Sequence, residues 1–319
     1  MQLIWDEPFV KERLSFFRGE KMEPELRASN MVKKNSLNKE LIIPWIFVLM
    51  WSSGAIFVEL GLSYADPFIF LSYRFFFAMV ILWIFCLKLK PSFPTNTYQW
   101  RLIVFTGLFQ QVGYQAFFFL ALDYNISPGL LAIILGAQPV TTTILTKAGA
   151  SRIQWVGLSL GMIGLILVVL NSILVGTISL FGIICCILSL GSITYGTILQ
   201  KKIKISLPIN MAIQYTCSFI VFIIVAPFFG SLAVDWSITF WVSLLWMVLI
   251  ITVGATMLLY YMISKGNLTN VTSLFYCVPP LTAILDYLIF GNILQLSTFA
   301  GLLLIVIGLI LINKKGSMT

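Results

Sequence analysis

Ten long apolar stretches, separated by short polar breaks, dominate the pattern of this chain. Each stretch is close to the ~20 residues that an α-helix needs to cross the hydrocarbon core of a bilayer. The breaks carry turn-forming or charged residues, as in "SYADP", "KLKPSFPTN" and "LDYNISPG". The pattern predicts an all-α integral membrane protein with ten transmembrane helices, at about residues 41–60, 67–87, 99–121, 127–146, 153–171, 177–199, 208–230, 239–263, 269–290 and 296–313.

The composition excludes a soluble protein. The 319 residues are 59% apolar and only 10% charged, and the mean hydropathy is +0.98, whereas soluble domains carry roughly 25% charged residues. Residues 1–40 differ, with eight Lys or Arg, seven Asp or Glu and no apolar run. We expect a cytosolic N-terminal tail there, either without fixed structure or lengthened beyond a true start at Met22 or Met31. A helix lying on the membrane surface is the alternative.

The basic residues predict the orientation of the helices. With the N-terminus in the cytoplasm, 19 of the 20 Lys and Arg residues fall on the cytoplasmic side, and the remaining one is Arg74, inside a span. The outer loops hold Asp66, Asp123 and Asp235 and no basic residue. Because cytoplasmic loops are enriched in Lys and Arg, we expect a multi-pass protein of a bacterial-type cytoplasmic (inner) membrane, with both termini in the cytoplasm. The net charge of +8 then reflects topology, and a nucleic acid partner is not expected.

The ten stretches form two similar sets of five. The segment "LGAQPVTTTIL" is similar to "YCVPPLTAILD", which places Pro139 and Pro280 141 residues apart. The segment "WVGLSLGMIGLIL" is similar to "FAGLLLIVIGLIL" at an offset of 144 residues. We therefore expect a first repeat over 41–171 and a second over 177–313, followed by a short cytosolic C-terminus at 314–319.

An odd number of helices in each repeat has a geometric consequence. The second repeat must enter the membrane from the opposite side, so the two repeats are expected to be inverted. Inverted repeats are typical of secondary transporters, whose site lies near the midplane between the repeats. Pro139 and Pro280 lie near the middle of their helices. Each frees a backbone carbonyl, which is tolerated against protein or a water-filled cavity, so we expect both prolines to mark helix breaks that line a cavity.

Several motifs, taken in order, resemble a known family. They are "WSSGAIFV", "PFIFLSYRFFFA", "FFFLALDYNISPGLLAIILGAQPVTTTIL" and "LLYYMISKGNLTNVTSLFYCVPPLTAILDYLIFG", together with the two glycine-containing closing helices. The chain resembles the EamA type of the drug/metabolite transporter superfamily over about residues 41–313. The resemblance implies ten helices in two inverted five-helix repeats around a central cavity. It also places helices 5 and 10 at the periphery, where they could support a homodimer.

Three charges lie inside the predicted spans. Arg74 is expected about 10 Å below the outer end of helix 2, and Glu59 and Asp286 also lie in the outer half of the membrane. A guanidinium between two carboxylates would be compensated, so Arg74 could form a structural ion pair, contact the substrate, or do both in turn. Asp286 and Glu59 are the candidates for proton coupling, with a solvated interfacial carboxylate as the alternative for Glu59.

Polar and aromatic residues predict a substrate pocket. Gln111 and Tyr114 lie on one face of helix 3, and amides in a membrane need partners, which are either other helices or a substrate. A mixed aromatic and polar lining is usual for small-molecule sites. The candidate substrate-binding residues are Arg74, Gln111, Tyr114, Trp51, Ser53, Tyr195, Tyr260 and Tyr276.

These features predict a secondary active transporter of a small organic metabolite, amino-acid-like or amphipathic, working by alternating access and favouring export. The summed charge of −1 inside the spans favours zwitterions or cations over phosphorylated substrates. One alternative is an importer of a nucleoside-like or adenosyl metabolite; another is a membrane scaffold or lipid-modifying protein that transports nothing. An enzyme is not expected, because the chain has no His and no GxxxxGK[ST] motif. No metal or cofactor is expected either.

Overall fold

The computed structural model describes residues 24–147, 150–173, 179–290 and 296–313. The side chains of residues 24–41 and 170–173, of Asp286 and of Phe290 lie outside this description. By its contacts the chain divides into two units, residues 1–46 and 47–319. The helical bundle described below belongs to the second unit, except for residues 42–46 of its first helix.

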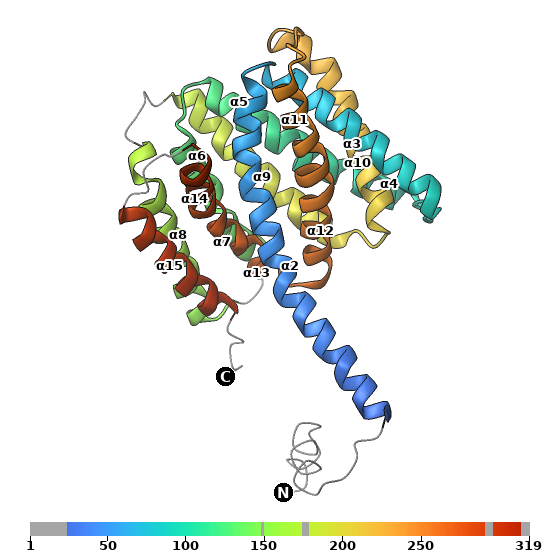
Figure 1. Cartoon of the computed structure of the whole chain (residues 1–319), viewed down its shortest axis with the longest axis vertical. Helices are drawn as coiled ribbons and strands as arrows, with labels where there is room; N and C mark the ends of the chain where they lie inside the picture. Colours follow the sequence, from blue (N-terminus) through green and yellow to red (C-terminus); the bar gives the residue numbers. More distant parts are fainter. Residues whose placement is uncertain (1–23, 148–149, 174–178, 291–295, 314–319) are drawn as a thin grey trace, which may run out of the picture. The chain divides into compact units, whose positions relative to one another are not determined.

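Ten helical spans within the described residues are long and apolar enough to cross a membrane, which confirms the predicted all-α membrane protein. We number them 1 to 10 in chain order (Figure 1). Span 1 is the C-terminal part of α2 (Pro24–Leu62), from Ile42 onwards. The others are α3 (Pro67–Leu89), α4–η1–α5 (Thr97–Gly107, Leu108–Gly113, Tyr114–Asp123), α6–α7 (Pro128–Gly136, Gln138–Thr146), α8 (Arg152–Ile173), α9 (Leu180–Lys202), α10–η2 (Leu207–Val225, Ala226–Phe228), α11–η3–α12 (Ile238–Trp246, Met247–Ala255, Thr256–Lys265), α13–η4–α14 (Leu268–Ser273, Leu274–Cys277, Val278–Phe290) and α15 (Leu296–Asn313).

The helix starts follow from local sequence. Pro67 and Pro128 stand in the first turns of α3 and α6, where the missing N–H of proline costs no helical hydrogen bond. The side chains of Ser127, Ser179 and Ser237 each accept a hydrogen bond from a backbone N–H in the first turn of the helix that follows. Lipid cannot accept hydrogen bonds from the free N–H groups at a helix start, and these serine side chains accept them instead. The polar breaks in the sequence therefore coincide with the helix starts that the pattern predicted.

Four spans are irregular near their middle, at corresponding places in the two halves of the chain. Spans 3 and 8 each contain a π-helical segment, η1 and η3. Span 4 is broken between α6 and α7, and span 9 passes through the 3₁₀ turn η4 before α14. Pro139 and Pro280 stand in the first turns of α7 and α14, so the expected helix breaks are present. Such interruptions leave backbone groups that must be paired within the protein.

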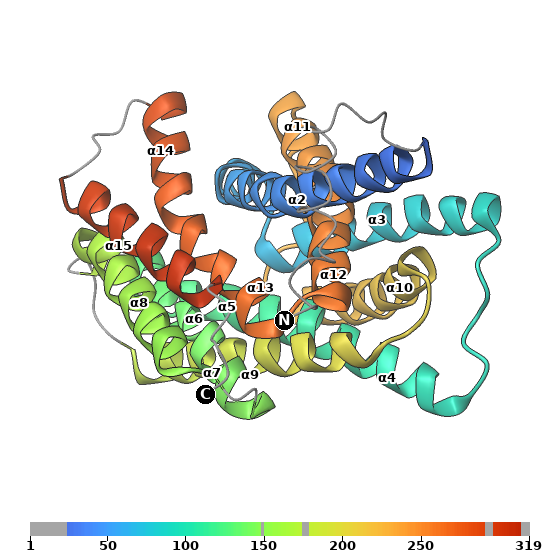
Figure 2. The same ribbon diagram turned by 90° about the horizontal axis from the view of Figure 1, so that it is seen from below.

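Spans 5 and 10 pack directly against each other through glycines (Figures 1 and 2). A Cβ at Gly157 would lie 2.7 Å from the carbonyl oxygen of Gly308, and one at Gly164 would lie 2.6 Å from that of Gly301. The helices are therefore antiparallel. At the repeat offset of 144 residues, Gly157 corresponds to Gly301 and Gly164 corresponds to Gly308. Each contact therefore joins the first glycine of one helix to the second glycine of the other, which is the reciprocal form of two helices related by a two-fold axis. The glycine stripe thus serves packing within the chain, and a homodimer through these helices stays a prediction.

The first spans of the two halves pack in a reciprocal way. In span 1, Ser52 accepts a hydrogen bond from Thr282 of span 9 (3.1 Å), and Ser53 accepts one from Trp246 of span 8 (3.0 Å). In span 6, Thr194 is 3.2 Å from the Thr141 hydroxyl of span 4. Thr141 and Thr282 are equivalent in the repeat, at an offset of 141 residues. Each half therefore inserts its first span against the later spans of the other half.

The two ends of the bundle differ in charge. At one end, Ala65 and Val234 form an isolated backbone bridge, and the backbone N–H of Ser231 donates to the Asp66 carboxylate (2.5 Å). At the other end, Lys201 Nζ donates to the backbone oxygens of Ser264 and Gly266, at 3.2 and 2.7 Å. Between residues 42 and 313 the loops at the Lys201 end hold the basic residues and no Asp or Glu. We call the end with Asp66 the acidic end and the end with Lys201 the basic end.

The glycine contact between spans 5 and 10 predicts different effects of the same substitution at two helical positions. Gly164→Ala should destabilise the protein by about 1–3 kcal/mol, because the added methyl group meets a backbone oxygen that cannot move aside easily. Gly191→Ala in α9 should be neutral or stabilising, because a Cβ there meets nothing within 4 Å and alanine favours a helix. Thermal unfolding of the purified variants in detergent measures both. Equal changes in Tm would contradict this packing.

Candidate substrate-binding site

Arg74 lies in the interior of the bundle, held by two spans from different halves of the chain. It is only 7% exposed. Its Nε donates to Thr252 Oγ1 of η3 at 2.5 Å, and its Nη1 donates to Gln115 Oε1 of α5 at 2.9 Å. The ring of Phe75 lies 5.7 Å from the guanidinium carbon. The guanidinium is therefore oriented by neutral groups that contribute no compensating charge.

The described partners of Arg74 do not include Glu59, one of the two carboxylates that the sequence suggested. Glu59 was expected to help compensate it, but its side chain is exposed and forms no contact with Arg74 among the described residues. Asp286 lies in α14, and its side chain is outside the described part of the chain. Arginine has five N–H donors, and the described residues accept hydrogen bonds from two of them. The remaining three donors have no acceptor among the described residues.

The π-helix of span 8 helps to hold this arrangement. The Thr252 hydroxyl donates to the backbone oxygen of Met247, five residues earlier (2.8 Å), while it accepts from Arg74. The backbone oxygen of Thr252 accepts from the Tyr215 hydroxyl of α10 at 2.5 Å. Thr252 therefore joins spans 2, 7 and 8, and its hydroxyl and carbonyl are both occupied.

A second set of buried polar residues runs from the middle of the bundle towards the basic end. Gln111 Nε2 donates to the Tyr260 hydroxyl (2.9 Å), and this hydroxyl donates to Gln214 Oε1 (2.6 Å). Gln214 Nε2 then donates to Gln200 Oε1 (3.0 Å) and to Asn210 Oδ1 (2.8 Å). All five side chains are buried and uncharged. We call these residues the amide network, and it links spans 3, 6, 7 and 8.

The amide network and the Arg74 cluster are adjacent along three helices. Gln111 and Gln115 are one turn apart in span 3, and Gln214 directly precedes Tyr215 in span 7. Thr252 and Tyr260 both belong to span 8. A displacement of any of these helices therefore changes both sets of hydrogen bonds together. Among the predicted substrate-binding residues, the structure brings Arg74, Gln111, Tyr114 and Tyr260 into this region.

The remaining predicted residues have other described partners. Trp51 packs against Phe47 and Phe275, with both ring centroids at 5.4 Å, and Ser53 donates to the Met50 backbone oxygen (2.6 Å). Tyr276 is fully buried against Gly161 of α8, so it is a packing residue between spans 5 and 9.

Tyr114 and Tyr195 also lie beside phenylalanines. The ring of Tyr195 is 47% exposed and lies 5.0 Å from that of Phe109. The ring of Tyr114 lies 6.0 Å from that of Phe118, four residues further along the same span. The described ring contacts of both tyrosines are therefore made within span 3 or between spans 3 and 6. Tyr114 also lies within electrostatic range of Arg74.

Sequence reasoning missed several residues of the site, chiefly Thr252, Gln214, Asn210 and Gln200. A usable signal was present for the three amides, because an amide inside an apolar span must find a polar partner. Thr252 gave no such signal, because a threonine hydroxyl can donate a hydrogen bond to a backbone carbonyl of its own helix. The described residues contain no group of three or more His, Cys, Asp or Glu that could hold a metal ion.

Comparisons with known proteins agree with this architecture. The model of the EamA-like transporter family matches the chain twice, over residues 40–170 and 180–314. The uncharacterized transporter YvbV of Bacillus subtilis is 26% identical over 284 residues, covering 84% of this chain and 89% of the relative. An uncharacterized transporter of Archaeoglobus fulgidus is 25% identical over 279 residues, covering 84% and 95%. A solved crystal structure, 16% identical, superposes with a TM-score of 0.74 over 85% of this chain and 95% of that one, and so shares the fold.

The amide network predicts that one of two neighbouring tyrosines matters for stability. Tyr260→Phe leaves a donor on Gln111 and an acceptor on Gln214 buried without the partner between them, which should cost about 1–3 kcal/mol. Tyr261→Phe is the matched control, because that ring is 39% exposed. Thermal unfolding in detergent should show a lower Tm for Tyr260→Phe alone. A Tm that is the same for both variants would contradict the network.

Proposed function

Because this chain belongs to the EamA-like transporter family and is a transporter, we propose that it moves a small, amino-acid-like organic metabolite whose carboxylate binds Arg74. It acts as a secondary active transporter by alternating access and exports the metabolite, the direction that the family resemblance favours. The observation that carries the proposal is the buried guanidinium, which is oriented by Gln115 and Thr252 and retains donors that the described residues do not occupy.

Electrostatics favours an anionic group at this site. A buried cation without a counter-charge is costly, and a carboxylate that enters beside it removes that cost while accepting two parallel hydrogen bonds. The sequence alone suggested a summed charge of −1 inside the spans, but Glu59 is exposed and is not a partner of Arg74. Arg74 is the buried charge among the described side chains, so a substrate with a carboxylate fits better than a simple cation.

The arrangement of the halves supports alternating access. Spans 5 and 10 meet in the reciprocal manner of a two-fold pair, and spans 1 and 6 each pack on the other half. Arg74 belongs to the first half, and its partner Thr252 belongs to the second. We propose that the halves are inverted repeats whose relative movement exposes Arg74 to each side in turn.

The amide network is the proposed closure towards the cytoplasm. It joins Gln111 of the first half to Tyr260 and Gln214 of the second, and it lies between the Arg74 cluster and the basic end. Neutral hydrogen bonds of this kind are worth about 1 kcal/mol each, so they can close a path and still break during each cycle. The basic end would face the cytoplasm of a bacterial-type cell, as Lys and Arg enrichment predicts.

Transport assays with two matched arginine variants test the proposal. The purified protein is reconstituted in liposomes, and counterflow is measured with amino acids, polyamines and purine nucleosides. We expect flux of amino acids, and we expect Arg74→Lys to reduce it about 10-fold or more, because an ammonium cannot present the two parallel donors of a guanidinium. Arg101→Lys, an exposed arginine at the basic end, should transport like the parent.

Three outcomes would contradict this assignment. Equal flux in the parent and in Arg74→Lys would remove Arg74 from the site. Nucleoside flux without amino acid flux would favour the nucleoside importer. Flux of no substrate class, with the protein folded and inserted, would favour a scaffold or a lipid-modifying protein.

A further inference from the structure

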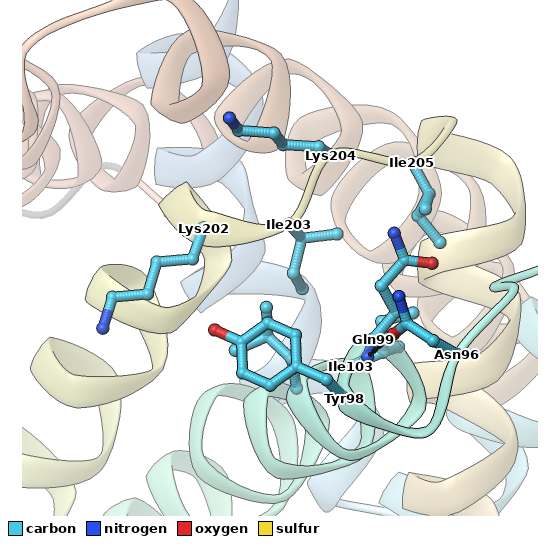
Figure 3. Close-up of a pocket in the computed structure, with 9 residues that line it drawn as sticks. Asn96, Tyr98, Gln99, Ile103, Lys202, Ile203, Lys204 and Ile205 are labelled. Carbon is cyan, nitrogen blue, oxygen red and sulfur yellow. Dashed lines mark hydrogen bonds between the residues drawn. The ribbon is translucent and has the colours of Figure 1, made fainter.

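A pocket of about 280 Å³ opens at the basic end, away from the Arg74 cluster (Figure 3). It lies between the start of α4 and the segment that joins α9 to α10. Its floor is apolar and its rim is polar and basic. The lining residues are Asn96, Tyr98, Gln99, Leu102, Ile103, Lys202, Ile203, Lys204 and Ile205. We propose that this pocket binds the phosphate headgroup of an anionic phospholipid from the leaflet at the basic end.

Two lysines supply the charge for such a ligand. Lys201, Lys202 and Lys204 follow one another closely in the chain, and only Lys201 is engaged by the fold, where it donates to the backbone oxygens of Ser264 and Gly266. Lys202 and Lys204 are exposed, and neither forms a hydrogen bond or ion pair with the described residues. In Figure 3 their side chains both extend to the left of Ile203, which points towards the Tyr98 ring.

The surroundings add to the positive potential. No Asp or Glu occurs in the loops at this end between residues 42 and 313. The first turn of α4 borders the pocket, with Asn96 as its N-cap, so the positive end of the helix dipole of span 3 points there. Anions are therefore attracted to the pocket by the side chains and by the backbone.

The pocket lies where a lipid headgroup would be. Its two walls are the first turn of span 3 and the last residues of span 6, which is the boundary between the apolar spans and the loops. Tyr98 is 66% exposed and Trp100 is 39% exposed, and such aromatic side chains are enriched at the membrane–water interface. Basic pockets between transmembrane helices on the cytoplasmic side favour anionic lipid headgroups.

Shape and polarity favour a lipid over a soluble phosphate. The floor contains Leu102 and Ile103, which are 8% and 0% exposed, with Ile203 and Ile205 beside them. A fully hydrated phosphate gains nothing from such a floor, whereas the glycerol and upper acyl carbons of a phospholipid can cover it. At about 280 Å³ the pocket is also just below the usual size range of small-molecule sites, which suits a headgroup.

Native mass spectrometry of the purified full-length protein tests the proposal. The protein is titrated with dioleoyl phosphatidylglycerol, with dioleoyl phosphatidylcholine and, separately, with glycerol 3-phosphate. We expect tighter binding of phosphatidylglycerol than of phosphatidylcholine. Lys202→Gln with Lys204→Gln should weaken phosphatidylglycerol binding about 25-fold, since each lysine near a membrane surface contributes roughly a fivefold factor.

A control pair separates the pocket from the general charge of this end. Lys88→Gln with Arg152→Gln removes the same charge from exposed positions outside the pocket and should change phosphatidylglycerol binding less than twofold. Equal weakening by the two pairs would overturn the proposal, because the lipid would then respond to net charge alone. Binding of glycerol 3-phosphate as tight as that of phosphatidylglycerol, lost in the Lys202/Lys204 pair, would also overturn it in favour of a soluble phosphate site.

Discussion

The buried guanidinium of Arg74 is the constraint on which the structure of the site depends. Lipid offers no hydrogen bonds and no screening, so a charge inside the bundle must be oriented by the protein itself. The chain does this with one amide from span 3 and one hydroxyl from span 8. Both partners are neutral, which leaves the charge of Arg74 uncompensated among the described residues. In the proposed function, a ligand that brings a negative charge would compensate it.

The same constraint shapes the rest of the interior. The amide network pairs each of its members with another side chain, and the π-helix of span 8 pairs the Thr252 hydroxyl with a carbonyl five residues earlier. Spans 5 and 10 carry few polar groups and approach each other closely through glycines. The bundle therefore separates two tasks. The helices with buried polar residues contain the candidate site, and spans 5 and 10 join the two halves through their glycines.

The sequence predicted the ten spans because apolar length is a direct consequence of bilayer thickness. It also identified Arg74, Gln111 and Tyr260, because polar groups in lipid are costly and stand out. The sequence could not predict the partners of these residues. Arg74 and Thr252 are 178 residues apart, and a threonine in a span does not by itself indicate a polar contact. The π-helices were missed for a similar reason. An extra residue in a helical turn leaves no mark in an apolar pattern, although Gly113 and Gly254, which are 141 residues apart, both fall in these segments.

In the proposed function, Arg74 binds the carboxylate of the substrate. Counterflow in liposomes with pairs of compounds that share one carbon skeleton tests it most directly, comparing each amino acid with the amine formed by removal of its carboxylate. We expect the amino acids to exchange and the matching amines not to compete with them. Amines that exchange or compete as well as their parent amino acids would contradict it.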